Sequence, residues 1–169
     1  MDIRPATPAD VPAVLPMVSK IAALHEAWDP AKYGYIANVA ERYRNWLGAR
    51  ATDSNSVFLV AERPGVNGEP AKLVGFLIAT VENEIPIYRV TSYGFIHDLW
   101  IEPDYRHEGL ARQMTMLAIE RFREIGADQV RLDTAAANDP ARNLFASCGF
   151  RPSTTEMLLE LKPGSHSEP

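Results

Sequence analysis

Residues 98–114 read DLWIEPDYRHEGLARQM, an apolar run followed by a turn and the start of an amphipathic helical pattern. Residues 102–104 (EPD) form the turn, and Gly109 stands immediately before the helical pattern. A glycine at a strand-to-helix junction lets the backbone approach a ligand, and the first helical turn presents unpaired N–H groups at the positive end of the helix dipole. With Arg106 nearby, this segment predicts a phosphate or pyrophosphate site, while a tight turn with a solvated charge is the alternative.

The sequence of this loop excludes two common nucleotide-binding motifs. A Walker A loop needs GxxxxGK followed by Ser or Thr, and a dinucleotide fingerprint needs GxGxxG after the first strand of a βαβ unit. The sequence contains neither pattern. The identity of the anion therefore depends on the rest of the chain.

The composition is that of an ordinary globular protein. The chain has 169 residues, 46% hydrophobic and 23% charged, and we expect one domain over residues 1–162 with a flexible C-terminal tail over 163–169. The net charge of −5 argues against nucleic acid or an anionic membrane as a partner, because both select basic surfaces. Cys148 is the single cysteine, and no signal peptide or membrane-spanning run is visible, so we expect a cytoplasmic protein.

Hydrophobic periodicity predicts a chain that mixes strands and helices. Strands are predicted over residues 2–6, 57–62, 72–81, 93–101, 129–134 and 155–161. Helices are predicted from Thr7 onward with a kink at Pro16, over about 36–49, from 109 to 125, and over 139–147 with Asn138 as its cap. Strands come first as hairpins and then alternate with helices, which predicts an α/β (α+β) fold with a mixed central sheet covered on both faces.

The hexad Arg106-His107-Glu108-Gly109-Leu110-Ala111 resembles the acyl-CoA motif R/Q-x-x-G-x-G/A of the GNAT N-acetyltransferase superfamily. The preceding DLWIEPDYR is similar to that family's lead-in strand and turn, and residues 3–14 (IRPATPADVPAV) are similar to its first strand and helix. Residues 138–150 (NDPARNLFASCGF) resemble its NxxAxxLYxxxGF segment. The resemblance thus extends over nearly the whole chain.

This resemblance implies a GNAT fold in which the strand over 93–101 splays from the strand over 129–134 and exposes backbone groups to the pantetheine arm of CoA. It implies direct transfer of an acetyl group from acetyl-CoA to an amine, without a covalent enzyme intermediate and without a metal. The pyrophosphate is expected on the N–H groups of the loop. The implied cofactor-binding residues are Leu99, Trp100, Ile101, Arg106, His107, Glu108, Gly109, Leu110, Ala111, Arg112, Asn138 and Phe145.

The proton of the acceptor amine requires a catalytic base. An alkylamine is mostly protonated at neutral pH, so acyl transfer needs a group that removes a proton. In a regular strand, side chains alternate, which puts His97 on the face of Leu99 and Ile101 and puts Asp98 on the opposite face. We therefore expect His97 to be the general base, directly or through water, and Asp98 to be structural. The alternative is that His97 makes its hydrogen bonds inside the sheet and has a structural role, or that it only binds substrate.

Phe145 departs from the family pattern, because many members have a tyrosine here whose hydroxyl can protonate the leaving thiolate. Phenylalanine has no such proton, so the general acid is unassigned, and Tyr105, Ser147 or a water is a substitute. The departure also motivates a second hypothesis: a non-catalytic module that binds acyl-CoA as a sensor.

The acceptor side is predicted from an aromatic segment. An aromatic wall with nearby carboxylates suits a cationic amine, carried by a small molecule or a peptide, although the same residues could simply pack a helix on the sheet. Dimerisation is common in the family, so a homodimer is compatible with the resemblance. The residues concerned are Trp28, Tyr33, Tyr35, Tyr43, Trp46, Glu82 and Glu84.

Overall fold

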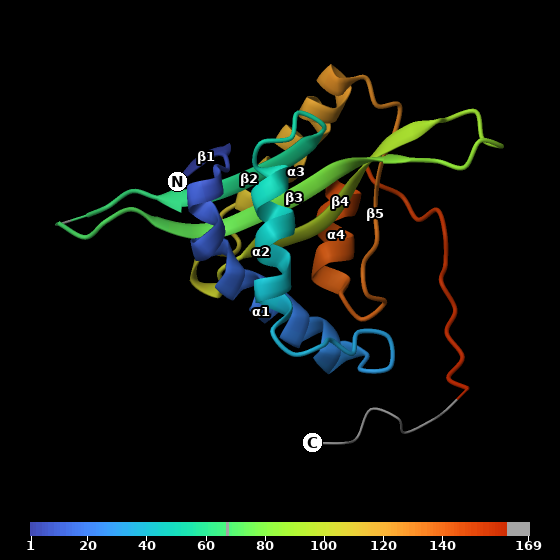
Figure 1. Ribbon diagram of the computed structural model, residues 1–169, viewed down its shortest axis with the longest axis horizontal. Helices are drawn as coiled ribbons and strands as arrows, with labels where there is room; N and C mark the ends of the chain where they lie inside the picture. The colour runs from blue at the N-terminus through green and yellow to red at the C-terminus, as the bar shows by residue number, and fades with distance from the viewer. Residues whose placement is uncertain (67, 162–169) are drawn as a thin grey trace.

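The computed structural model describes residues 1–66 and 68–161 (Figure 1). Its strands are β1 (Asp2–Pro5), β2 (Ser56–Arg63), β3 (Lys72–Asn83), β4 (Ser92–Ile101) and β5 (Val130–Leu132). Its helices are α1 (Val11–Trp28), α2 (Val39–Arg50), α3 (Leu110–Ile125) and α4 (Asp139–Ser147), with short 3-10 turns at Pro8–Asp10 and Pro103–Tyr105. The predicted tail over 163–169 lies outside the described residues.

The strands form one mixed sheet in the order β1-β2-β3-β4-β5. Neighbours are antiparallel except for β4 and β5, which are parallel. Helices α1 and α2 lie over one face and α3 over the other, with α4 packed against α3 (Figure 1). The predicted mixed sheet with helices on both faces is therefore confirmed.

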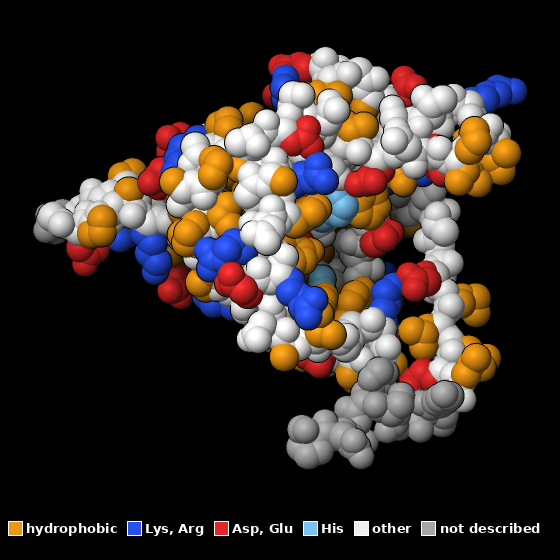
Figure 2. Space-filling view, in the orientation of Figure 1, with side chains coloured by type: hydrophobic (Ala, Val, Ile, Leu, Met, Phe, Trp, Pro, Cys, Tyr) orange, Lys and Arg blue, Asp and Glu red, His pale blue; other side chains and the backbone are white. Residues whose placement is uncertain are grey.

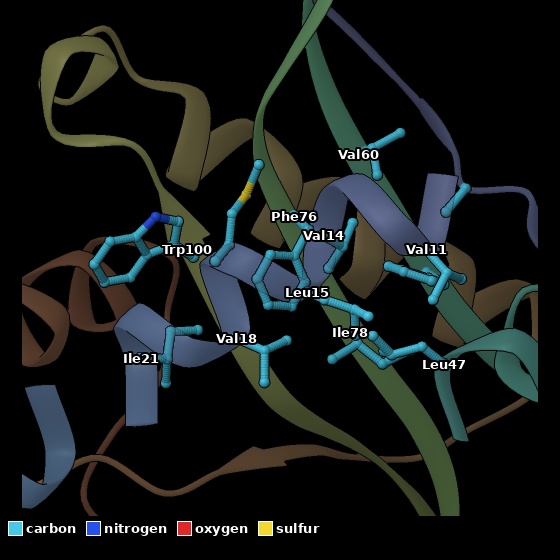
Figure 3. Packing of buried hydrophobic residues seen from close by; sticks show 13 residues of the cluster. Val11, Val14, Leu15, Val18, Ile21, Leu47, Val60, Phe76, Ile78 and Trp100 are labelled. Carbon is cyan, nitrogen blue, oxygen red and sulfur yellow. The ribbon is translucent and has the colours of Figure 1, made fainter. Parts of the chain in front are cut away.

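Alternating side chains of β2 and β3 build a hydrophobic core on each face of the sheet. On the α1 face, Val14 and Val18 pack onto Phe76 and Ile78 (Figure 3). On the α3 face, Leu77 packs with side chains of α3, including Met114 and Phe122. The period of two in the strands and of 3.6 in the helices thus brings the apolar residues together as expected.

Strands β4 and β5 pair over only three residues and then separate. Gly94 to Ile96 pair with Val130 to Leu132, and the remainder of β4 has no partner strand on that side within the described chain. Gly94 allows the close packing of β4 on α3, since a Cβ there would lie 2.6 Å from the ring of Phe122. The separation leaves an opening in the sheet beside the C-terminal half of β4.

Three sequence predictions need correction. The strand expected over 155–161 is absent: this segment pairs with no strand, because the edge that could receive it, β5, is only three residues long and lies apart from it (Figure 1). That short β5 also replaces the longer strand expected over 129–134. The second helix begins at Val39 rather than at about residue 36, because Asn38 takes a left-handed conformation (φ 62°) that an α-helix cannot continue through.

Candidate acyl-CoA cleft

A cleft of about 610 Å³ occupies the opening where β4 and β5 separate. Its walls come from the C-terminal half of α1, residues 96–101 of β4, the loop that leads into α3, the segment after β5, and α4. Figure 2 views the hollowed face, with histidine side chains inside the hollow. Elements far apart in the sequence thus meet at the point where the sheet is open.

Most of the site residues predicted from the sequence line this cleft. All of the predicted site residues line it except Glu108 and Arg112, whose contribution to the loop is their backbone. Those that line it are His97, Leu99, Trp100, Ile101, Arg106, His107, Gly109, Leu110, Ala111, Asn138 and Phe145.

The loop before α3 presents a run of backbone N–H groups. His107 and Gly109 both have positive φ values, 67° and 80°, and these two left-handed residues turn the chain into the first turn of α3. Within the part of the chain that the structure describes, the N–H groups from His107 to Arg112 have no hydrogen-bond acceptor. A Cβ on Gly109 would meet only the Nε2 of Gln113, at 3.7 Å, so the space in front of these donors is open. Such an arrangement can bind an anion.

Arg106 fastens this loop to the end of β4. Its Nε donates to the carbonyl oxygen of Ile101 at 2.9 Å, and its guanidinium lies 4.7 Å from the centre of the Trp100 ring. The sequence suggested a direct contact between Arg106 and a phosphate. In the structure Arg106 holds the end of β4 through its Nε and lines the cleft, and its contact with a phosphate stays a prediction.

A β-bulge changes the direction of His97. The residues on either side of it pair with consecutive residues of β3, so His97 is the extra residue in β4. Leu99 packs with the core on the α3 side, whereas the ring of His97 lies on the α2 side, 5.3 Å from the ring of Trp46 in an edge-to-face arrangement. The prediction that His97 shares a face with Leu99 and Ile101 is therefore wrong, because the bulge resets the alternation.

The imidazole of His97 is held by a short chain of polar groups. Its Nε2 lies 2.6 Å from the Oγ1 of Thr80, and that hydroxyl donates to the Oε1 of Glu82 at 2.5 Å. Because an ionised Glu82 can only accept and Thr80 has one proton to give, Nε2 must carry a hydrogen and donate it to Thr80. This tautomer leaves the lone pair on Nδ1. Burial lowers the pKa of His97, and the Glu82 carboxylate offsets part of that effect.

Asp98 places a second ionisable group in the same cleft. Its Oδ2 is buried and has no hydrogen-bond partner among the described residues. Burial raises the pKa of this carboxyl to about 6, and the hydroxyl of Tyr43 offsets part of the rise. Strand alternation indicated a structural role for Asp98. An acid next to His97, inside a strand whose other residues from 95 to 101 are apolar, was the signal that could have identified it.

The α4 side of the cleft is mainly apolar. Asn138 caps α4 as predicted, with its Oδ1 accepting from the N–H of Ala141 at 3.2 Å. Phe145 is 8% exposed and packs edge to face on Phe150. Of the substitute acids, Tyr105 lines the cleft, whereas Ser147 donates to the carbonyl of Leu144 at 2.6 Å and does not line it.

The aromatic residues near α1 and α2 divide between the cleft and the core. Trp28 lines the cleft, together with His25, whose ring stacks on that of Tyr33. Tyr43 and Trp46 pack against the core on the α1 face. Glu84 forms an ion pair with Arg131, whereas the Oε1 of Glu82 lies 3.6 Å from the Nε2 of His97. The two predicted carboxylates therefore do not act together.

No group of three or more His, Cys, Asp or Glu side chains that could hold a metal ion occurs in residues 1–66 and 68–161. In the same residues, no helix has both the length and the apolar character needed to cross a membrane.

Comparison with known proteins gives a consistent picture. A family model described as the acetyltransferase (GNAT) family matches residues 21–150. The chain is 29% identical over 84 residues to the N-alpha-acetyltransferase 30 of Saccharomyces cerevisiae, covering 50% of this chain and 46% of that protein. It is 31% identical over 106 residues to a mycothiol acetyltransferase of Thermobispora bispora, covering 60% of this chain and 32% of that protein. The chain thus spans less than half the length of these two relatives.

Solved structures share the fold. A mutant of the BH1408 protein from Bacillus halodurans superposes with a TM-score of 0.78 at 21% identity, covering 96% of this chain and 100% of that chain. An aminoglycoside antibiotic 6'-N-acetyltransferase from Acinetobacter haemolyticus superposes with a TM-score of 0.68 at 16% identity, covering 96% and 99%.

Proposed function

The chain belongs to the GNAT acetyltransferase family, and from that premise we propose that it transfers an acetyl group from acetyl-CoA directly to a primary amine. The observation that carries this proposal is the run of N–H groups from His107 to Arg112 at one end of the cleft, without acceptors among the described residues. These donors suit the pyrophosphate of CoA, and Arg106 supplies positive charge beside them. The separated half of β4, from Leu99 to Ile101, would contact the pantetheine arm.

The reaction would proceed in a ternary complex. The acceptor ammonium first gives one proton to the base, which leaves the nitrogen with the lone pair that attacks the thioester carbonyl. The carbon–sulfur bond then breaks to release the CoA thiolate, and the second proton that the nitrogen loses passes to solvent. Bringing both substrates together in one cleft replaces a bimolecular encounter by an oriented attack. No covalent intermediate on Cys148 is needed.

His97 is the base in this proposal. Its lowered pKa keeps the imidazole neutral at pH 7, so it can accept a proton. The chain from Glu82 through Thr80 fixes the hydrogen on Nε2, which leaves Nδ1 as the atom that takes the proton from the amine, directly or through water. Thr80 and Glu82 are thus positioning residues.

Asp98 would attract the acceptor. With a pKa of about 6 it is largely ionised at neutral pH, and its buried Oδ2 has no partner in the described chain. A protonated amine entering the cleft would supply that partner, with Trp28 as an aromatic wall beside it. The relatives' printed names cover an N-alpha-acetyltransferase and mycothiol acetyltransferases, so we propose an amine of a small molecule or peptide as the acceptor.

The leaving thiolate would take its proton from Tyr105 or water. Phe145 has no proton to give, and Ser147 is engaged with the α4 backbone. Tyr105 lines the cleft next to the loop that holds the pyrophosphate in this proposal.

A second candidate function is favoured by Phe145: a protein that binds acyl-CoA without turning it over. This candidate shares the cofactor site with the first and differs from it only in the chemistry. It predicts binding of acetyl-CoA and no thiol release above background with any amine.

Calorimetric titration with acetyl-CoA tests the site that both candidates share. We expect one binding site per chain, and at least a tenfold weaker affinity in Gly109→Trp, because the indole would fill the space in front of the N–H groups. Gly126→Trp is the matched control: it also has a positive φ (91°), no heavy atom lies within 4 Å of the position of its Cβ, and it lies outside the cleft. Absence of binding by the wild-type protein, or undiminished affinity in Gly109→Trp, would refute the assignment of the loop.

A further inference from the structure

The cleft contains a second acidic side chain that the proposed mechanism does not use. Asp133, the residue that follows β5, lines the cleft together with Asp98. Among the Asp, Glu, Lys and Arg residues that line the cleft, the other member is Arg106, which belongs to the loop before α3. The part of the cleft away from that loop therefore carries two carboxyl groups and no Lys or Arg side chain in its lining.

The strand register places Asp133 opposite His97. The pairing of β4 with β5 ends at Ile96 and Leu132, and both of these side chains pack in the core on the α3 side. Alternation directs the side chain of the next residue, Asp133, to the other face of the sheet. His97 follows Ile96, and its ring also lies on that other face, against Trp46 of α2. The Asp133 carboxylate and the proposed base therefore lie on the same side of the sheet, across the opening between the two strands.

The Asp133 carboxylate has no cationic partner of its own. It forms no ion pair within residues 1–66 and 68–161, and the residue is exposed. Lys32, in the connection between α1 and α2, is bonded to Glu156 instead. The pKa of Lys32 is raised first by Glu156 and also by the charge of Asp133, which confirms that Asp133 lies on the α1 and α2 side. Asp133 thus offers an unpaired negative charge at the mouth of the cleft.

Asp98 offers an unpaired oxygen deeper in the same cleft. Its Oδ2 is buried and has no hydrogen-bond partner in the part of the chain that the structure describes. A buried carboxylate oxygen without a partner is costly, and a donor on a ligand removes that cost. Neighbouring strands lie about 5 Å apart and successive residues about 3.3 Å apart, so the backbones of Asp98 and Asp133 are separated by at least about 6 Å. The two carboxylates can therefore bind two different cationic groups.

The wall that α1 contributes to the cleft suits an aliphatic chain between two such groups. Its lining side chains include Ile21, Leu24 and Trp28. Methylene groups gain free energy by packing on apolar side chains, and an ammonium group gains from a nearby aromatic ring. An extended chain advances roughly 1.2 Å per bond, so a diamine of three to five carbons spans roughly 5–7 Å between its nitrogens. This span matches the minimum separation of Asp98 and Asp133.

We propose that the acceptor is a short aliphatic diamine: Asp98 and His97 meet the ammonium group that is acetylated, and Asp133 binds the second ammonium group. This inference rests on the proposed acetyl transfer and names its substrate class. An amine with a single positive charge gains nothing from Asp133, so this residue selects for two charges. Acetylation converts the reacting ammonium into a neutral amide. The product therefore loses its ion pair with Asp98 and keeps only the one with Asp133, which favours its release.

Thiol release from acetyl-CoA measures the preference for two charges. A four-carbon diamine is compared with the four-carbon amino alcohol, in which a hydroxyl replaces the second ammonium group. In the wild type, kcat/KM should be about tenfold higher for the diamine: a factor of two because either nitrogen can react, and about fivefold from the ion pair with an exposed carboxylate. Asp133→Asn should reduce this ratio to about two. Asp128→Asn is the matched control and should keep the wild-type ratio, because Asp128 is an exposed aspartate on the other side of β5 and lies outside the cleft.

Two results would overturn the inference and leave the proposed acetyl transfer in place. One is a wild-type ratio of about two, and the other is a ratio that Asp133→Asn does not change. If no amine gives thiol release, the proposed transfer fails, and calorimetric titration of the diamine and the amino alcohol in excess CoA makes the same comparison without turnover. About tenfold tighter binding of the diamine, reduced to about twofold in Asp133→Asn, would then support the diamine site, and binding within a factor of two in the wild type would overturn it.

Discussion

Replacing Asp98 by asparagine tests the electrostatics of the cleft interior. Burial raises the pKa of Asp98 from its ordinary value of 3.8 to about 6. The folded protein therefore holds this proton more tightly than the unfolded chain does. The stabilisation by the neutral carboxyl is fully present below about pH 4 and is lost as the pH rises through about 6.

The difference between the two pKa values sets the size of the effect. It corresponds to a loss of about 3 kcal/mol in the free energy of unfolding once the carboxyl is fully ionised. Asparagine does not ionise, so the free energy of unfolding of the variant does not fall in this way as the pH rises. Between about pH 4.5 and about pH 7.5, the variant should gain about 2 kcal/mol relative to the wild type. A changed contact with Tyr43 would shift the stability of the variant equally at both pH values.

Urea unfolding of both proteins at the two pH values measures this gain. Asp128→Asn, at an exposed position after α3, is the matched control and should follow the wild type at both pH values. A stability difference between Asp98→Asn and the wild type that does not change with pH would refute the buried carboxyl. So would a difference that changes in the opposite direction.

Three further predictions concern packing and chemistry. Gly94→Ala should lower the free energy of unfolding by about 1–3 kcal/mol, because the added Cβ would meet the Phe122 ring at 2.6 Å; an unchanged unfolding curve would contradict the packing of β4 on α3. At saturating acceptor amine, where the bound ammonium keeps Asp98 ionised, kcat should rise with pH through a pKa below 6.5, at which His97 loses its proton. His97→Gln should lose this limb, and a limb that persists would belong to another group. Thr80→Val should lower kcat about tenfold and leave the affinity for acetyl-CoA unchanged, as measured by steady-state kinetics and calorimetry, because the imidazole loses the acceptor that orients it; an equal kcat would remove Thr80 from the positioning chain.

Features with a local cause could be predicted from the sequence. The turn at residues 102–104, the glycine at 109 and the helical spacing that follows depend on nearby residues, and the structure has a turn, a left-handed Gly109 and α3 in these places. The cap of α4 by Asn138 is equally local and is confirmed. The mixed sheet could be predicted from the order of strands and helices, because elements joined by short connections usually lie side by side in the fold.

Features that depend on tertiary contacts could not be predicted in the same way. The bulge at His97 arises because β4 has one more residue than the stretch of β3 it pairs with. The sequence of one strand shows the alternation of its side chains but not this mismatch with its partner. The raised pKa of Asp98 comes from the burial of the strand it lies in. Residues 155–161 have a strand pattern, but a pattern does not supply the edge with which a strand must pair.

The central claim is that the cleft transfers an acetyl group to an amine. Release of CoA thiol from acetyl-CoA, followed with a thiol reagent across a panel of amines that spans polyamines, amino sugars and peptide N-termini, tests it most directly. The account predicts release above background with at least one amine, and a large loss of that release in His97→Ala while acetyl-CoA still binds. Tight binding of acetyl-CoA without release for any amine would contradict the claim and identify the chain as an acyl-CoA sensor.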